Sequence, residues 1–559
     1  MSSMNPIFKT GFEALPFELC RLITEETESG NDLWALTLVS KHCYAAFNYS
    51  LYKEITSAAL FTLGLAEKAR LPLTGPHPAS YVKSIDFDLL DDEEYTYILG
   101  GGPFQRNGRT SKRKKQKQEK KSLDPTTLQK LLTAAVSNIM FYAPHASINS
   151  LHYNCKALSL SQVFGNINPA VFSLTELSLG FPVLNTNLRK TMAIIESLLS
   201  PSMIYLDLDF FEHGSLDPLV LAKILRKTQS NCPNLKQLCL GSPTSRLSLK
   251  TTKKPPAHPI QALLNDPTFI FPSLKSLSLV EYEDSPVILE DYISFLTRHS
   301  HITAFEFMQV GGSFPPAVGV SRCAESILPN LVLLQGSVND CVTLCASGTR
   351  PVEAIELTLE AKSASAVGSD ALVLALQNTK TLTRLFIHDL RFITGGDSVG
   401  VDTDLLKSIA SACPGLTHFQ CALEVEGELA VLTLQLVYAI IAVKLQHLRH
   451  FKISICVRDV PQSDLERNSK IRDPSHPLYK LYKTSIKELD PVLLRYHDLE
   501  TVQIRIFGRS KERSTEPGGH KPFLVTTVYL VRSQGGFVEA QVCDRMEFQM
   551  DEFREYGSS

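Results

Sequence analysis

Two pairs of residues in this chain of 559 residues have side chains suited to chemistry, one pair of cysteines and one of histidines. Cys341 and Cys345 could belong to a zinc site only if a second Cys or His pair lay nearby, and the sequence offers none. We therefore expect no metal. His299 and His301 end a helix-like segment, where a surface or helix-capping role is commoner than catalysis.

Motifs of well-known catalytic sites are missing from the sequence. It contains no GxSxG, no HExxH, no glycine-rich loop that ends in Lys-Ser or Lys-Thr, and no GxGxxG between a strand and a helix. Three glycines at 100 to 102 lack the lysine and helix that a phosphate-binding loop needs. The sequence therefore predicts a protein that is not an enzyme and has no cofactor.

The densest charge lies at 109 to 121, RTSKRKKQKQEKK, with eight basic residues and one acid. Few apolar side chains accompany it, so we predict a disordered, charged insertion at about 91–123. A nuclear import signal is one interpretation, with its charge on Lys112, Arg113, Lys114, Lys115, Lys117, Lys120 and Lys121. A solvated loop that pairs with the acids before it is the alternative. Nucleic acid is a less favoured partner, since no aromatic residue interrupts the run.

The N-terminal stretch has the most regular apolar spacing. Leu15, Leu19, Leu22 and Ile23 form one stripe of a helix at about 16 to 27, and Pro16 suits its first turn. A second helix could be capped by Asn31 or Asp32, and a third by Ser40. Three helices in about 40 residues bury few side chains by themselves, so we expect another molecule to cover part of their surface.

This stretch resembles the F-box family, and its closing Leu-Tyr resembles fungal members in particular. The resemblance rests on the pattern Leu15-Pro16-x-Glu18-Leu19-x-x-x-Ile23, Leu33-x-x-Leu36-x-x-Val39-Ser40-Lys41 and Leu51-Tyr52. It implies an F-box at 12–56 that binds a Skp-type adaptor, and through it a cullin-RING ubiquitin ligase of the SCF type. The implied adaptor-binding residues are Leu15, Pro16, Leu19, Ile23, Leu33, Trp34, Leu36, Val39, Tyr44 and Leu51. Alternatively, the helices only cap the domain that follows.

The rest of the chain repeats a segment written apolar-x-x-apolar-x-apolar. Ten clear copies begin at Leu174, Met203, Leu235, Leu274, Ile302, Val352, Leu382, Leu416, Leu448 and Leu499, and weaker ones at Val82, Ile148 and Leu331. Many of the starts lie 28 to 32 residues apart, with helix-like segments between them. Each unit is thus a strand, a loop and a helix, whose apolar faces only stacked neighbours can bury.

These units resemble leucine-rich repeats, with looser spacing than usual. The expected fold is an α/β solenoid in which a three-helix F-box precedes a curved array of strand-loop-helix units; an ordinary α/β domain is the alternative. The expected domains are a disordered N-terminus at 1–11, the F-box, a linker helix at 57–79, the solenoid at 80–510 and a β-hairpin cap at 511–559. The hairpin is indicated by alternating β-rich segments around a glycine turn.

A solenoid of this kind would bind a protein substrate on its strand face. Positions inside and just after each triplet should face outward, and their charge changes from acidic to basic along the chain. The substrate-binding candidates are Asp207, Asp209, Glu306, Met308, Phe386, His388, Lys452 and Arg505. Alternatively, the charged candidates are ordinary solvated surface residues with no binding role. The sequence does not predict which substrate is bound.

Composition fits a protein of the cytoplasm, the nucleus or both. The 12 cysteines are scattered, unlike those of a disulfide scaffold, and the N-terminus lacks the features of a signal peptide. The longest uncharged run, Leu429 to Val443, is too short to span a bilayer and predicts a buried helix instead. The main functional hypothesis is an SCF substrate receptor. The second is a leucine-rich scaffold or nuclear interaction protein outside any ligase.

Overall fold

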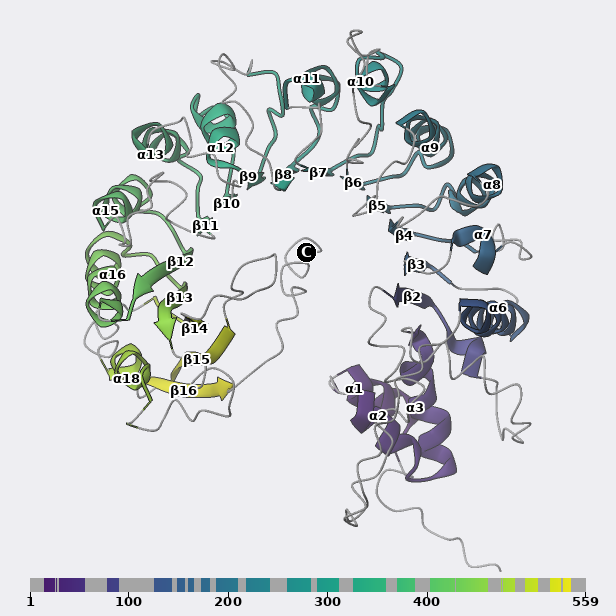
Figure 1. Cartoon of the computed structure of the whole chain (residues 1–559), viewed down its shortest axis with the longest axis horizontal. Helices are drawn as coiled ribbons and strands as arrows, with labels where there is room; N and C mark the ends of the chain where they lie inside the picture. Colours follow the sequence, from purple (N-terminus) through teal and green to yellow (C-terminus); the bar gives the residue numbers. More distant parts are fainter. Residues whose placement is uncertain are drawn as a thin grey trace, which may run out of the picture. The chain divides into compact units, whose positions relative to one another are not determined.

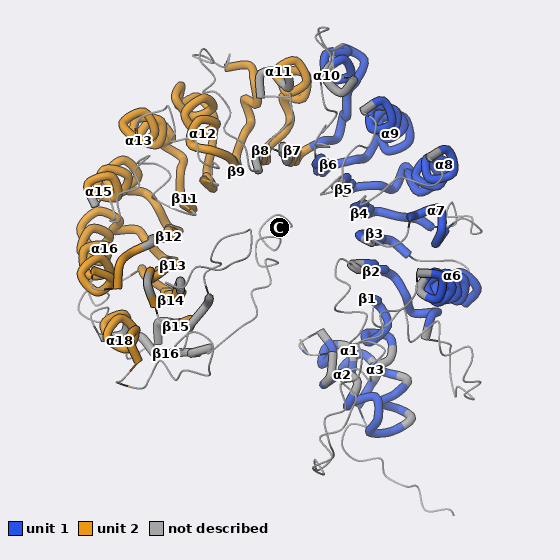
Figure 2. The backbone as a smooth tube through the Cα atoms, viewed as in Figure 1, with its two compact units in different colours: residues 1–274, 285–287 blue, residues 275–284, 288–559 orange. Residues whose placement is uncertain are grey.

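The computed structural model describes residues 15–25, 27, 30–55, 78–89, 125–142, 148–155, 159–164, 172–180, 188–209, 218–241, 259–282, 289–310, 325–357, 369–387, 403–427, 429–460, 474, 476–487, 498–510, 523–533 and 536–543. Two compact units make up the chain (Figure 2). Unit 1 is Met1–Leu274 with Ser285–Val287, and unit 2 is Lys275–Asp284 with Ile288–Ser559. The expected disordered terminus, charged insertion and nuclear signal lie outside the described residues, as does the linker helix apart from Pro78 and Ala79.

Unit 1 begins with three helices, α1 (Phe17–Glu25), α2 (Gly30–Thr37) and α3 (Lys41–Lys53). The predicted cap at Ser40 is present, because its hydroxyl accepts from the Cys43 amide at 3.1 Å. Asn31 and Asp32 do not cap α2, since that helix begins at Gly30 and both lie inside it. Asp32 instead sits in the first turn, where a carboxylate favours the positive end of the helix dipole.

Six strands follow in chain order in unit 1, and every neighbouring pair is parallel. They are β1 (Glu54–Ile55), β2 (Ser84–Leu89), β3 (Ser150–Cys155), β4 (Glu176–Gly180), β5 (Tyr205–Asp209) and β6 (Gln237–Gly241). The helical elements around them are η2 (Pro78–Tyr81), α6 (Pro125–Tyr142), α7 (Leu160–Val163), α8 (Leu188–Leu198), α9 (Pro218–Asn231) and α10 (Pro259–Leu264).

Unit 2 continues the same pattern. Its strands are β7 (Ser276–Tyr282), β8 (Ala304–Val310), β9 (Leu333–Gly336), β10 (Ala354–Leu357), β11 (Arg384–Ile387), β12 (His418–Glu426), β13 (His450–Val460), β14 (Thr501–Ser510), β15 (Phe523–Ser533) and β16 (Gly536–Cys543). Its helices are α11 (Leu289–Arg298), α12 (Val338–Cys345), α13 (Ser369–Asn378), α15 (Thr403–Ala412), α16 (Ala430–Lys444) and α18 (Tyr479–Lys487). Strands β7 to β14 are parallel, whereas β15 and β16 form an antiparallel hairpin on β14.

The repeat predicted from the sequence is confirmed at the level of strand and helix. A strand lies on each of the ten clear triplets and on the three weaker ones. In each unit the helices that alternate with the strands lie on one side of them (Figure 1). The structure is therefore consistent with an α/β solenoid of the leucine-rich type.

Burial explains why the repeat is apolar at these three positions. Leu174, Leu177 and Leu179 of one copy are fully buried, as are the corresponding residues of the next, Met203, Leu206 and Leu208. Threonines join successive repeats before the strands begin: the hydroxyls of Thr175, Thr303, Thr383 and Thr417 each donate to a carbonyl of the preceding repeat at 3.1 to 3.3 Å. Each of these carbonyls also accepts the backbone N–H groups of the same threonine and of the residue after it, so the hydroxyl adds a further bond at the same point.

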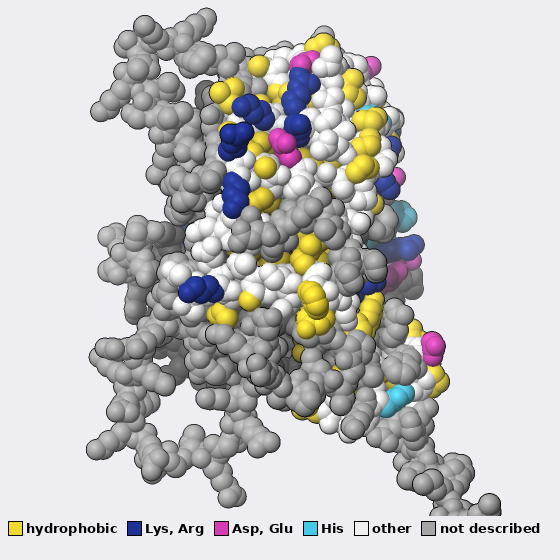
Figure 3. All heavy atoms as spheres, turned by 90° about the vertical axis from the view of Figure 1, so that its right-hand side faces the viewer, with side chains coloured by type: hydrophobic (Ala, Val, Ile, Leu, Met, Phe, Trp, Pro, Cys, Tyr) yellow, Lys and Arg dark blue, Asp and Glu magenta, His cyan; other side chains and the backbone are white. Residues whose placement is uncertain are grey.

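The outer sides of most helices are polar, as expected for surface helices. Figure 3 views the helical side of unit 1, where basic side chains gather over α8 and α9; the exposed ones include Arg189, Lys190, Lys223 and Lys227. Helix α16 differs, because the predicted buried helix at Leu429 to Val443 is buried on one side only. Among the described helices, none combines the length and apolar character that crossing a membrane requires.

Candidate functional site

The three N-terminal helices enclose a small core of their own. Cys20 of α1 and Cys43, Ala46 and Phe47 of α3 are buried together, and Leu15, Ile23 and Leu36 pack against them half-buried. The His42 ring lies 2.9 Å from the Leu15 carbonyl and so holds the start of α3 beside the start of α1. Apolar residues outside this core are available to another molecule.

Four large apolar side chains of these helices are exposed, and we call them the N-terminal apolar face. Leu19 and Leu22 lie on α1, and Leu38 and Val39 form the turn between α2 and α3, with exposed fractions from 45% to 63%. Isolated apolar residues on a surface are ordinary, so these four are candidates for contact with another molecule because of their number in so small a bundle.

Some of the predicted adaptor-binding residues are exposed on these helices, and others are half-buried. Pro16, Leu19 and Val39 are exposed, whereas Leu15, Ile23, Leu33, Leu36, Tyr44 and Leu51 are half-buried. Trp34 lies on α2, but its side chain is not among those described. The list of candidates omitted Leu22 and Leu38. Leu22 belongs to the apolar stripe of α1, and Leu38 adjoins Val39, so the sequence held a signal for both.

The strand face of unit 2 carries a continuous row of residues on the side away from the helices, one from each neighbouring strand; two of them, Ser278 and Gln420, are buried, and the others are half-buried. In register from β7 to β14, the row is Ser278, Glu306, Gln335, Glu356, Phe386, Gln420, Lys452 and Gln503. The residue after each, such as Phe307, Leu357 or Ile387, is buried. The strand alternation thus brings three predicted candidates, Glu306, Phe386 and Lys452, onto one row.

The other predicted substrate residues lie elsewhere. Arg505 faces outward two positions beyond this row on β14, opposite Ser454, and Met308 follows Glu306 by two positions on β8. Asp207 and Asp209 lie on β5 in unit 1, where the Ser178 hydroxyl donates to Asp207 at 2.9 Å. His388 is outside the described residues.

A group of basic residues that was not predicted from the sequence lies beside the row. Arg384, His418 and His450 are in register on β11, β12 and β13, two positions before Phe386, Gln420 and Lys452. The two histidine rings stack, with centroids 4.3 Å apart. With Lys452 and Arg505 these residues form what we call the basic cluster. Glu500 lies at its edge, 3.7 Å from the His450 ring and 3.9 Å from the Arg449 guanidinium.

The positive charges of the basic cluster affect the pKa of His418. Burial, then the neighbouring His450, Arg384 and Arg449, lower the pKa of His418 to about 4. The unfolded chain would protonate this residue near its ordinary pKa of 6.5. Protonation therefore favours the unfolded chain, and the contribution of His418 to stability falls as the pH drops from about 6.5 to about 4.

Substitution of Arg384 by Gln tests this arrangement. Removal of one positive charge beside His418 should raise the pKa of His418 towards its ordinary value. NMR titration of histidine-labelled protein measures the shift, with Lys480→Gln on helix α18 as a control that also removes a positive charge. An unchanged pKa of His418 in Arg384→Gln would show that the positive charge of Arg384 does not lower that pKa.

The histidine and cysteine pairs that the sequence singled out as possible catalytic or metal-binding residues contribute to packing and helix capping instead. His299 is buried, its Nδ1 lies 2.7 Å from the Phe295 carbonyl, and its ring stacks on Phe295 near the end of α11. That is the predicted capping role, and burial lowers the pKa of His299 to about 4. Cys341 and Cys345 are buried on α12, and the hydrogen bond with Cys345 together with burial raises the pKa of Cys341. Within the described part of the chain, no three His, Cys, Asp or Glu residues are grouped to hold a metal ion.

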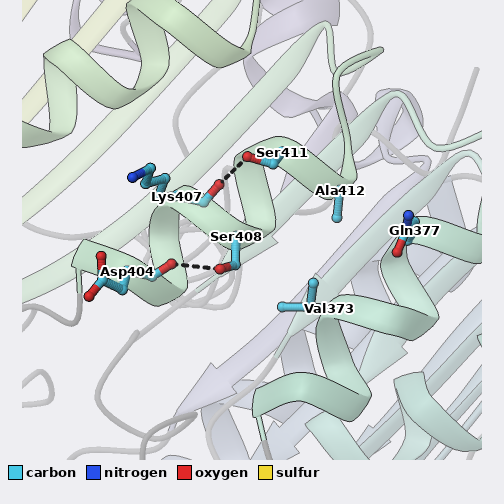
Figure 4. Close-up of a pocket in the computed structure, with 7 residues that line it drawn as sticks. All are labelled: Val373, Gln377, Asp404, Lys407, Ser408, Ser411 and Ala412. Carbon is cyan, nitrogen blue, oxygen red and sulfur yellow. Dashed lines mark hydrogen bonds between the residues drawn. The ribbon is translucent and has the colours of Figure 1, made fainter.

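A groove of about 420 Å³ lies between α13 and α15 in unit 2 (Figure 4). Its lining is Val373, Gln377, Asp404, Lys407, Ser408, Ser411 and Ala412. Both serine hydroxyls donate to carbonyls of their own helix, at 2.8 Å to Asp404 and 2.7 Å to Lys407. A catalytic site needs a nucleophile beside a base, and this groove does not assemble them.

Comparison with known proteins does not assign the chain to a family. No protein-family model matches the sequence. No curated protein matches it either.

Proposed function

We propose that this protein is the substrate-recognition subunit of an SCF-type ubiquitin ligase. The N-terminal apolar face docks on a Skp-type adaptor, and the strand face of the solenoid binds a protein substrate. The single observation that carries the proposal is the exposure of Leu19, Leu22, Leu38 and Val39 in a bundle whose sequence resembles an F-box. In this proposal the chain is not catalytic: it raises the effective concentration of the substrate beside the ligase.

The N-terminal apolar face fits adaptor docking better than a role as a simple cap. A cap for a solenoid should present a polar outer surface to water. Here the outward residues of α1 and of the turn after α2 include four Leu and Val side chains. Full burial of such a side chain contributes about 1.5 to 3 kcal/mol, and about half of that remains to be gained here, because each is already partly covered.

The strand face favours a substrate whose charge changes sign along its length. Glu306 and Glu356 lie in the row on β8 and β10, before Phe386, whereas Lys452 lies after it on β13, with Arg505 on the next strand. Phe386 lies between them and is the aromatic anchor we expect to contribute most, since aromatic side chains dominate binding energy at interfaces. Charge order of this kind acts mainly on association rate and specificity.

Co-elution of the purified full chain with a Skp-type adaptor tests the proposal. We expect a complex with one copy of the adaptor per chain. If the folded chain elutes separately from the adaptor, the proposal fails, and the scaffold hypothesis, in which the strand face binds partners without a ligase, takes its place.

A further inference from the structure

Helix α16 has apolar residues on all sides, and only one side packs into unit 2. Ala430, Leu434, Val437, Tyr438 and Ile441 are buried. The opposite side carries Leu429, Leu432, Leu436, Ala439 and Val443, all exposed, and we call these residues the α16 stripe. Its Leu and Val members have exposed fractions of 42% to 65%.

The neighbouring helices show that this is unusual within the same unit. The exposed residues of α15 are Asp404, Lys407, Ser408 and Ser411, and those of α18 include Lys480 and Lys483. The α16 stripe contains no charged or polar side chain. Its members are spaced by 3, 4, 3 and 4 residues, the period with which one helix packs against another in a coiled coil.

The two ends of the stripe are equally far from its centre. Leu436 lies seven residues from Leu429 and seven from Val443. If two such helices met in opposite directions on a twofold axis at Leu436, Leu429 of each would meet Val443 of the other, and Leu432 would lie opposite Ile440, beside the small Ala439. A surface that complements itself in this way is what a symmetric dimer requires.

The charges at the two ends favour the antiparallel orientation. Glu426 is exposed just before α16, and Lys444 is its last residue. Antiparallel pairing brings Glu426 of one copy towards the Lys444 end of the other. It also places the positive end of each helix dipole beside the negative end of its partner. A parallel pair would place like charges together at both ends.

We propose that the α16 stripe is a contact surface with a second copy of this chain, in which the two α16 helices pack antiparallel about Leu436. One helix face is smaller than the roughly 800 Å² that each partner contributes to a standard interface. The dimer should therefore dissociate on dilution. This contact does not depend on the adaptor or on the strand face.

Sedimentation velocity of the full chain over a range of concentrations tests the proposal. We expect the wild-type mass to rise with concentration from 62.0 kDa towards twice that value. Leu436→Glu should remain monomeric, because it would place two carboxylates against each other at the axis. Leu374→Glu on α13 is the matched control, since Leu374 is an exposed leucine outside the stripe, and this variant should associate like wild type.

Cysteine cross-linking tests the orientation separately. A mixture of the Leu429→Cys and Val443→Cys variants should form the mixed disulfide faster than either variant links to itself. Circular dichroism verifies that each variant is folded. A wild-type chain that stays monomeric at every concentration, or a Leu436→Glu variant that associates like wild type, would overturn the proposal. So would faster linkage of Leu429→Cys to itself, which indicates parallel packing.

Discussion

A chain with Leu19→Asp and Val39→Asp should lose co-elution with a Skp-type adaptor. Both side chains are exposed, so the substitutions leave the core of Cys20, Cys43 and Phe47 intact. In the complex, each would replace apolar burial with a carboxylate removed from water. We expect a loss of more than about 2 kcal/mol, or about 30-fold in affinity, measured by calorimetric titration of the adaptor.

Leu219→Asp is the control for this variant. Leu219 is an exposed leucine on α9, also in unit 1, so its substitution adds the same charge away from the N-terminal helices. Adaptor affinity should stay within the error of wild type. Equal affinity for the double variant and wild type would show that the N-terminal apolar face is not the docking surface.

Arg350→Met should destabilise unit 2 by about 2 to 5 kcal/mol. Arg350 is 4% exposed, and its guanidinium Nε and Nη2 donate to the Ile327 carbonyl at 3.0 and 2.8 Å while Nη1 donates to Leu344 at the end of α12. Methionine preserves much of the volume but leaves two buried carbonyls without these donors, each at about 1 to 3 kcal/mol. Urea unfolding followed by circular dichroism measures the change.

Arg449→Met provides the comparison. The Arg449 side chain is 57% exposed, and its contact with Glu500 is a 3.9 Å ion pair at the surface. Such pairs contribute at most about 1 kcal/mol, so the urea midpoint should move little. If the two variants have the same urea midpoint, the hydrogen bonds of Arg350 to the Ile327 and Leu344 carbonyls do not stabilise unit 2.

The strand pattern was the most predictable part of the fold. A triplet such as Leu382, Leu385 and Ile387 can be read from the sequence because all three positions must be buried whatever the loops do. Alternation along a strand then fixes which side chains face outward, and this placed Glu306, Phe386 and Lys452 on one row.

The basic cluster shows where that reading was incomplete. In each triplet, the predicted binding positions are the one before the last apolar residue and the one after it. Arg384, His418 and His450 lie two positions earlier, on the same side of their strands. Their partnership depends on strand register and ring stacking, which the sequence of a single repeat does not contain.

Helix α16 shows that an apolar composition alone does not determine which side chains are buried. An uncharged run of 15 residues predicts burial, yet Leu432, Leu436 and Val443 are exposed. Periodicity cannot separate a buried side from an unpartnered one when both are apolar. The start of α2 had a similar ambiguity, because Gly30, Asn31 and Asp32 can all precede or begin a helix.

The most direct test of the proposed receptor is hydrogen exchange of the full chain with and without a Skp-type adaptor. If the N-terminal apolar face docks the adaptor, exchange should slow in α1 and in the α2–α3 turn around Leu38 and Val39, while β11 to β14 remain unchanged and open to substrate. Protection confined to the strand face, or no protection anywhere in a folded chain, would contradict the assignment of this protein as an SCF substrate receptor.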